Sequence, residues 1–136
     1  NNPSNPRSIF GANTANVRGN DLNRIPEWKT TLWGNYTWTL TNGSSLNFYA
    51  TWSWTDEMFY SPFNLDIDKS PDFNRLDLRA GWTSADRTYS ITGWVNNVTD
   101  EIAIRNLNLS AEGDNWSRTA TASTQRRWGI DFRYKF

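Results

Sequence analysis

The stretch that decides the fold is the end of the chain, Arg127-Trp128-Gly129-Ile130-Asp131-Phe132-Arg133-Tyr134-Lys135-Phe136. Aromatic and aliphatic side chains alternate in it with charged side chains and one glycine. Successive side chains of a strand point to opposite faces of its sheet. The alternation therefore predicts a strand with one aromatic face and one charged face.

Four earlier segments alternate in the same way. They cover residues 28–40, 45–55, 73–82 and 88–96. Together with residues 127–136 they predict five antiparallel strands. A short sixth strand is considered near Ile9 and Phe10, within residues 1–26, which otherwise show the Asn, Pro and Gly content of a loop.

The connections between these strands alternate between short and long. Asn42-Gly43 predicts a two-residue hairpin turn, because both residues tolerate a positive φ, and Ser84-Ala85-Asp86-Arg87 predicts a tight turn. Residues 57–71 and 98–122 are long polar and aromatic connections. Outer-membrane barrels have short periplasmic turns and longer extracellular loops. If the C-terminus is periplasmic, every long connection falls outside the cell.

The composition excludes several classes of function. The formal net charge is zero, which gives no broad surface for nucleic acid. The chain has no Cys and no His, so it lacks disulfides, thiolate metal ligands and the commonest general base. No nucleophile–base pair or phosphate-binding glycine loop is present, and we expect neither an enzyme nor a cofactor. No run approaches the roughly 18 apolar residues of a membrane-spanning helix, but a barrel strand needs only about 9–11 residues.

Aromatic residues make up 15% of the chain, and nine are Trp. A soluble, Trp-rich, carbohydrate-binding β-sandwich would also alternate, but its apolar faces would form a core that favours aliphatic packing. Two features favour a membrane barrel instead. Charges of both signs share one face, as in a polar lumen, and Trp and Tyr recur near strand ends, as in an aromatic girdle.

Three motifs carry a resemblance to a known family. They are Arg24-Ile25-Pro26-Glu27-Trp28 before the first strand, Val95-Asn96-Asn97-Val98-Thr99-Asp100-Glu101 after the fourth, and the terminal strand that ends in Phe136. Over about residues 20–136 the chain resembles the C-terminal β-barrel region of TonB-dependent outer-membrane receptors. It departs from the family pattern at Val98, where Leu is usual, and at Glu101, where Lys is common.

The resemblance implies an all-β fold: an antiparallel transmembrane β-barrel segment, comprising the last five or six strands of a barrel of about 22. Residues 1–26 are then an extracellular loop and residues 27–136 the C-terminal barrel portion. The chain opens like the middle of a loop, and we expect it to be a fragment of a longer protein. The plug domain, the other strands and the segment that contacts the TonB complex would lie upstream.

The resemblance also implies a function and a location. We expect active import of a scarce nutrient across the outer membrane of a Gram-negative bacterium, with a ferric siderophore or similar chelate as ligand. A passive porin-type barrel is the alternative, because its strands would show the same pattern. The implied partners are outer-membrane lipid, the upstream plug and strands, the TonB complex, the barrel-assembly machinery and the small-molecule ligand, but no nucleic acid.

Three groups of residues are candidates for these roles, and each also has a structural interpretation. An assembly signal, together with the structural role of lipid contact, is expected at Ile130, Phe132, Tyr134 and Phe136. Plug contacts or a solute path, or simple lumen solvation and cross-strand pairing, are expected at Arg75, Asp77, Arg79, Arg127, Asp131 and Arg133. Extracellular ligand contacts, or ordinary loop packing, are expected at Phe59, Tyr60, Phe63, Arg105, Trp116 and Arg118. Asp66-Ile67-Asp68 is a weak indication of calcium, because two carboxylates are far short of a full oxygen cage.

Overall fold

The computed structural model describes residues 17–109 and 118–136, and these fall into two compact units. The first, which we call the sheet unit, comprises Lys29–Trp54, Phe73–Ile102 and Thr124–Phe136. The second, the loop unit, comprises the described parts of Asn1–Trp28, Thr55–Asp72 and Ala103–Ser123. Each unit is described by itself below.

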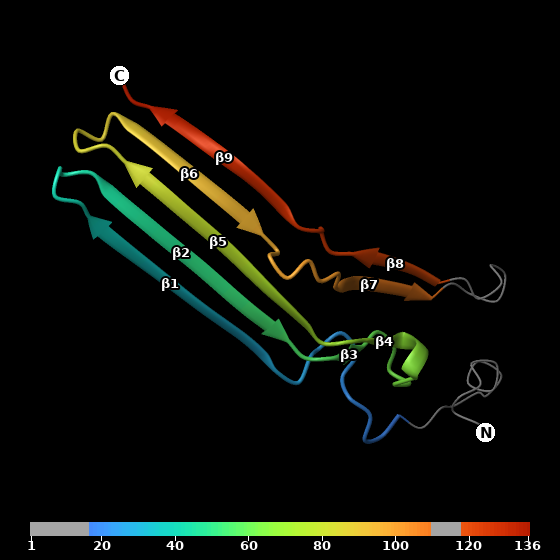
Figure 1. The fold of residues 1–136 in the computed structure, drawn as a ribbon. Coiled ribbons are helices and arrows are strands. Elements are labelled where there is room, and N and C mark those ends of the chain that lie inside the picture. The colour runs from blue at the N-terminus through green and yellow to red at the C-terminus, as the bar shows by residue number, and fades with distance from the viewer. Residues whose placement is uncertain (1–16, 110–117) are drawn as a thin grey trace. The chain divides into compact units, whose positions relative to one another are not determined.

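A five-stranded sheet forms the sheet unit, and Figure 1 shows neighbouring strands running in opposite directions. Its strands, in spatial order, are β1 (Lys29–Thr39), β2 (Ser45–Thr55), β5 (Phe73–Thr83), β6 (Tyr89–Asn96) and β9 (Arg127–Tyr134). The five predicted strands are confirmed, with ends that agree to within two residues. The proposed strand near Ile9 and Phe10 lies outside the described residues.

The register of the sheet keeps like side chains on one face. On the apolar face, Trp82 of β5 pairs with Ile91 of β6, which pairs with Phe132 of β9. On the opposite face, which we call the polar face, Thr92 pairs with Asp131. A slip of one residue would exchange the two faces completely. The alternation in the sequence is therefore realised consistently across β5, β6 and β9.

Within its own unit the sheet is a single layer with both faces open. Phe132 is 65% exposed and Trp82 is 36% exposed, although a β-sandwich would bury both. Among the described residues, the only buried apolar side chains are Tyr60 and Ala103, and both belong to the loop unit. An amphipathic sheet without a core of its own is the form expected of a barrel wall, whose apolar side faces lipid.

Both predicted tight turns are present, but the first has a different geometry. Gly43 alone is left-handed, with a φ of 83°, and its N–H donates to the Leu40 carbonyl. The Asn42 carboxamide oxygen accepts hydrogen bonds from the N–H and the hydroxyl of Ser44. The turn is therefore a three-residue loop with a left-handed glycine rather than the predicted two-residue turn, because the Asn42 side chain bonds forward instead of adopting a positive φ.

The second turn is built around an acidic side chain. Asp86 accepts hydrogen bonds from the Ser84 hydroxyl and the Thr88 N–H, and Arg87 is left-handed with a φ of 60°. These bonds, that from Ser84 first, lower the pKa of Asp86 below its ordinary value. Short turns thus join the strands at one end of the sheet. The two long connections, and the segment that leads into β1, attach to strand ends at the other end, as predicted.

Short strands occur within the two long connections that were predicted as loops. β3 (Met58–Phe59) pairs with β4 (Lys69–Ser70), and a single 3-10 turn, η1 (Asp66–Asp68), precedes β4. β7 (Ile104–Leu109) pairs with β8 (Arg118–Ala122). Among the described residues no helix is long and apolar enough to cross a membrane.

Candidate functional site

Asn97, directly after β6, is a buried residue whose side chain is hydrogen-bonded through both of its polar atoms. It is left-handed, with a φ of 56°, and is 3% exposed. Its Nδ2 donates to the carbonyl oxygens of Glu101 and Thr124, at 2.9 and 3.2 Å. Its Oδ1 accepts from the Thr99 hydroxyl at 3.1 Å, and its backbone N–H donates to Asp77 Oδ1 at 2.7 Å. Asn tolerates this backbone conformation better than most residues, and here each polar group of its side chain also has a partner.

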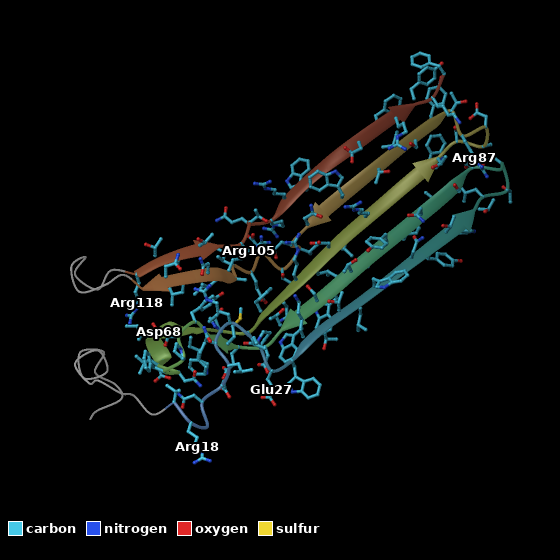
Figure 2. All side chains as sticks on the ribbon, turned by 180° about the vertical axis from the view of Figure 1, so that it is seen from behind. Arg18, Glu27, Asp68, Arg87, Arg105 and Arg118 are labelled. Atoms are coloured by element: carbon cyan, nitrogen blue, oxygen red, sulfur yellow. The ribbon has the colours of Figure 1, made fainter. Side chains whose placement is uncertain are left out.

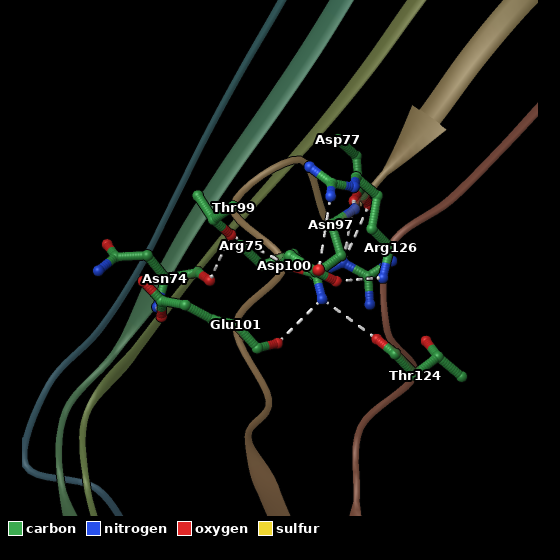
Figure 3. Close-up of polar contacts among 9 residues, drawn as sticks. All are labelled: Asn74, Arg75, Asp77, Asn97, Thr99, Asp100, Glu101, Thr124 and Arg126. Carbon is green, nitrogen blue, oxygen red and sulfur yellow. Dashed lines mark hydrogen bonds and ion pairs between the residues drawn. The ribbon is translucent and has the colours of Figure 1, made fainter.

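Two carboxylates extend this network to neighbouring strands (Figure 3). Asp100, also left-handed, accepts the Arg126 N–H at 2.8 Å through Oδ1 and lies 3.5 Å from its guanidinium through Oδ2. Glu101 Oε2 accepts the Asn74 N–H at 2.6 Å. The segment after β6 is thereby fixed to the start of β5 and to the chain that leads into β9. We call this network the Asn97 clasp; its members are Asn74, Arg75, Asp77, Asn97, Thr99, Asp100, Glu101, Thr124 and Arg126.

The clasp gives a physical reason for the sequence motif at residues 95–101. The sequence marked this motif as a family feature but did not predict its role. Asn and Asp tolerate left-handed backbone and bond to nearby main chain, which is a readable signal for an irregular turn. The partners Asn74, Thr124 and Arg126 are distant in sequence, so no local signal identifies them.

The six predicted lumen residues separate into bonded and unbonded groups. Arg75 Nε bonds to the Asp77 carboxylate at 3.0 and 3.1 Å, and Asp77 also serves the clasp. Arg75 and Asp77 both lie on β5, so this pair runs along one strand and is not the cross-strand pairing expected from the sequence. The side chains of the remaining four make no hydrogen bond or ion pair with any described residue, and all four residues are exposed on the polar face. They are Arg79, Arg127, Asp131 and Arg133.

The polar face also contains a depression of about 530 Å³ over β1, β2, β5 and β6. Arg79 and Tyr49 line it together with the hydroxyl side chains of Thr83, Ser90 and Thr92. Gly81 lies opposite Thr92 in the register, and a Cβ added there would lie 3.1 Å from Thr92 Oγ1. The missing side chain therefore contributes to the hollow.

Gly129 has a different role on the same face. A Cβ built at Gly129 would lie 2.6 Å from Cζ2 of Trp94, its partner in the register. The indole therefore lies directly against the glycine backbone. Such cross-strand packing of an aromatic residue on a glycine stabilises a strand that the glycine alone would weaken.

Hydrogen bonds between separate segments hold the loop unit together. The Tyr60 hydroxyl donates to the Ile104 carbonyl at 2.6 Å, which joins the β3–β4 connection to β7. The Arg24 N–H donates to the Phe59 carbonyl at 2.6 Å, which adds the N-terminal segment. Tyr60 is only 8% exposed, and burial raises the pKa of its phenol although the Arg24 charge opposes the shift.

The predicted ligand-contact residues occupy different environments within this unit. Tyr60 is buried and its hydroxyl is used internally, which favours the packing interpretation for that residue. Phe59 lines a depression of about 350 Å³ whose other walls include the carboxylate side chains of Asp21, Glu27 and Asp56. Phe63 is half-buried, and Arg105, on β7, is exposed. Trp116 lies outside the described residues.

Arg118 and Asp68 form an ion pair within the loop unit (Figure 2). Their closest atoms are Nη2 and Oδ1, 3.5 Å apart, and Asp68 is 2% exposed. Neither Asp68 oxygen has a hydrogen-bond partner among the described residues. Those residues also contain no group of three acidic, His or Cys side chains that could hold a metal ion, and the carboxylate of Asp68 faces a cation of the chain itself. The structure therefore adds no support to the calcium indication at Asp66-Ile67-Asp68.

The predicted assembly-signal residues form an exposed aromatic group at the chain end. Tyr134 lies 5.2 Å from Tyr89 and 4.8 Å from Phe136 between ring centroids, the second pair edge to face. Phe132 is 6.4 Å from Tyr89. Ile130 is 72% exposed on the same face. β9 is also an edge strand of the sheet, so its outer backbone groups are available for pairing with another strand.

Comparison with known proteins agrees with this architecture. A family model described as TonB dependent receptor-like, beta-barrel matches residues 4–98. This range contains β1, β2, β5 and β6 and reaches Asn97, but it does not include β9, from which the terminal-strand resemblance was drawn. Neither a curated protein nor a solved structure matches the chain.

Proposed function

Since the chain belongs to the family of TonB-dependent receptor-like β-barrels, and is thus part of an outer-membrane transporter, we propose that it forms the C-terminal wall of an active, TonB-coupled importer. In this proposal the apolar face of the sheet faces lipid, the polar face lines the lumen, and the C-terminus is periplasmic. The loop unit is extracellular and takes part in the first capture of a ferric siderophore or similar chelate.

The separation of the two faces carries the proposal. Trp82, Ile91 and Phe132 pair across one face, whereas Arg79, Asp131 and Arg133 occupy the other. Charge on the lipid side of a barrel is destabilising, whereas a lumen tolerates it. An apolar face turned to lipid and a polar face turned to an enclosed lumen together satisfy both faces of a single-layer sheet.

The loop unit supports a role in ligand capture. Its three segments are joined by main-chain and side-chain bonds, so it is a preorganised surface rather than three independent loops. A preorganised surface binds with less loss of conformational entropy. The residues that we propose for ligand contact are Phe59, Phe63, Arg105, Trp116 and Arg118, with Tyr60 as their packing support.

A passive porin is the second candidate, because its strands would show the same two faces. Accumulation of a radiolabelled ferric siderophore by cells separates the two functions. An active importer loses accumulation when TonB is absent or the proton gradient is dissipated, whereas a passive barrel keeps it and conducts ions in a planar bilayer. If accumulation persists without TonB and without the proton gradient, and the purified protein conducts ions in a planar bilayer, active import is ruled out.

Single cysteines test the orientation of the faces directly, because this chain contains none of its own. Ile91 and Thr92 are neighbours on β6 and point to opposite faces. In cells carrying the complete protein, Thr92→Cys should react with a small water-soluble maleimide in the lumen. Ile91→Cys should resist that reagent but react with a lipid-soluble one. Equal labelling of the two variants by the water-soluble reagent would contradict a lipid-facing apolar side.

A further inference from the structure

An amphipathic depression of about 350 Å³ lies in the loop unit, between residues 21–27 and residues 56–59. Leu22 is 69% exposed and Ile25 is 57% exposed, and exposed apolar surface that polar groups border is typical of an interaction site. No basic side chain is found among the described residues that line the depression. Its apolar lining includes Leu22, Ile25 and Met58, and its acidic lining includes Asp21, Glu27 and Asp56.

Two main-chain hydrogen bonds join the segments that form the depression. The Arg24 N–H donates to the Phe59 carbonyl at 2.6 Å, and the Asp56 N–H donates to the Trp28 carbonyl at 3.0 Å. Small-molecule sites are usually largely preformed, with apolar walls and a few polar groups that fix the orientation of the ligand. The depression has both of these properties.

Three of its carboxylates have no cationic partner. The carboxylates of Asp21 and Glu27 make no hydrogen bond or ion pair with a described residue. The carboxylate of Asp56 accepts only the N–H of the next residue, at 2.8 Å. A concave surface that carries charge of one sign concentrates ligands of the opposite sign. The depression is therefore suited to a cation.

The chain itself holds an ammonium group beside this depression. Glu57 and Phe59 also line it, and the Lys69 Nζ lies 2.6 Å from Glu57 Oε2 and 5.8 Å from the centre of the Phe59 ring. The hydrogen bond from Glu57 raises the pKa of Lys69. A carboxylate and an aromatic face thus already bind one ammonium here. Lys69 pairs with Glu57, and the other three carboxylates are left for a second cation.

An organic cation fits the lining better than a metal ion. The described residues contain no group of three acidic, His or Cys side chains that could hold a metal. Hard cations bind in cages of oxygen ligands, whereas much of this lining is carbon. The volume of about 350 Å³ is near the lower end of the usual range for small-molecule sites, which favours one small solute.

We propose that this depression binds a small organic cation, in which a protonated amine or a guanidinium is attached to an apolar body. The charged group pairs with Asp21, Glu27 and Asp56, and the apolar body contacts Leu22 and Met58. The inference goes beyond the proposed function, because these carboxylates repel an anionic chelate. It does not depend on whether import is active or passive.

The probe is 2-phenylethylamine, whose amine is protonated at neutral pH like that of Lys. Its binding to the complete protein in detergent can be followed by ligand-detected NMR. We expect saturable binding. Phenylacetate has the same ring and the opposite charge, and ethylammonium has the charge without the ring. Each should bind about tenfold more weakly or not at all, because each lacks one half of the match.

The test variant combines Asp21→Asn with Glu27→Gln, which removes two exposed charges and keeps the shapes of both side chains. It should weaken binding of 2-phenylethylamine about fivefold or more, since a single exposed ion pair contributes up to about fivefold. The matched control is Asp66→Asn, an exposed acidic residue of the loop unit that does not line the depression. We expect it to change the affinity by less than about twofold. Binding to detergent is common to all three proteins, so the comparison isolates the site.

Three results would overturn the site. The first is equal binding of phenylacetate and 2-phenylethylamine, which would show that charge does not select the ligand. The second is an equal loss of affinity in Asp66→Asn and in the double variant, which would show a diffuse field. The third is absence of saturable binding in the unaltered protein. If the double variant then also has a lowered melting temperature, these carboxylates pair with a basic side chain of another segment of the protein.

Discussion

The sheet unit and the loop unit are stabilised in opposite ways. The sheet is regular, and its register is consistent across β5, β6 and β9, yet its apolar side chains are largely exposed. The loop unit has little regular structure, but it contains the two buried apolar residues of the described chain, Tyr60 and Ala103. Hydrogen bonds join its distant segments. The stability of the sheet therefore depends on what covers its apolar face, whereas the stability of the loop unit depends on contacts within that unit.

The Asn97 clasp is the exception that sharpens this comparison. It lies in the sheet unit, but it has the buried, cross-linked character of the loop unit. Two long connections and the segment before β1 attach to one end of the strands, where the regular ladder stops. Irregular chain at that edge needs side-chain partners for its main-chain groups, and the clasp provides them.

Removal of the Asn97 side chain should have the largest effect on stability. Asn97→Ala leaves the Glu101 and Thr124 carbonyls without their donor and places Ala in a left-handed conformation, a loss of about 3–5 kcal/mol. Asn97→Gly should recover roughly 1 kcal/mol of this, because Gly accepts the positive φ. The urea midpoint of the complete protein in detergent, followed by Trp fluorescence, measures both.

Asn96→Ala is the control for that experiment, since Asn96 is adjacent on β6 but makes no side-chain hydrogen bond with a described residue. It should change stability by less than about 0.5 kcal/mol. An Asn97→Ala variant as stable as Asn96→Ala would show that the clasp contributes nothing beyond the sheet ladder.

Charge on the apolar face should have the next largest effect. Ile130→Arg in the middle of β9 should cost about 2–4 kcal/mol in a lipid bilayer. Arg133→Gln, a change of charge on the opposite face of the same strand, should stay within about 0.5 kcal/mol. Reversible unfolding in lipid vesicles gives both values. If the two variants were equally stable, the sheet would not depend on lipid as the comparison requires.

The sequence predicted the sheet well because a strand of two unlike faces has a local, repeated signal. Leu78, Ala80 and Trp82 alternate with Arg79 and Gly81, and the register preserves that alternation across the strands. The first turn was located correctly, but the predicted two-residue type was wrong. Whether Asn42 adopts a positive φ or bonds forward to Ser44 depends on a local competition that composition does not decide.

The loop unit and the clasp could not be predicted in the same way. The short strands β3 and β4 are too brief for a periodic signal. The bond from Tyr60 to Ile104 joins residues far apart in the chain, and so does that from Asn97 to Thr124. Tyr60 was expected among the ligand contacts because aromatic residues in loops serve both packing and binding, and only burial distinguishes the two.

The smallest predicted effect belongs to that tyrosine and is confined to the loop unit. Tyr60→Phe removes the donor to the Ile104 carbonyl at a cost of about 1 kcal/mol. Amide hydrogen exchange should quicken in β7 and β8 but not in β5 and β6. Tyr49→Phe, which removes a hydroxyl without a described hydrogen-bond partner, should leave exchange in both units unchanged. Faster exchange across β5 and β6 in Tyr60→Phe would show that the units are not independently stabilised.

The pKa of Tyr60 gives the same test a pH dependence. Burial raises this pKa above the ordinary value of 10.0, so above about pH 10 an unfolded Tyr60 releases its proton before a folded one does. The unfolded state then binds fewer protons, and stability falls as the pH rises through the raised value. Protection of β7 and β8 should therefore decline above about pH 10 in the unaltered protein. The Tyr60→Phe variant should lack that decline. If protection of β7 and β8 still declines in this variant, the decline comes from other tyrosines.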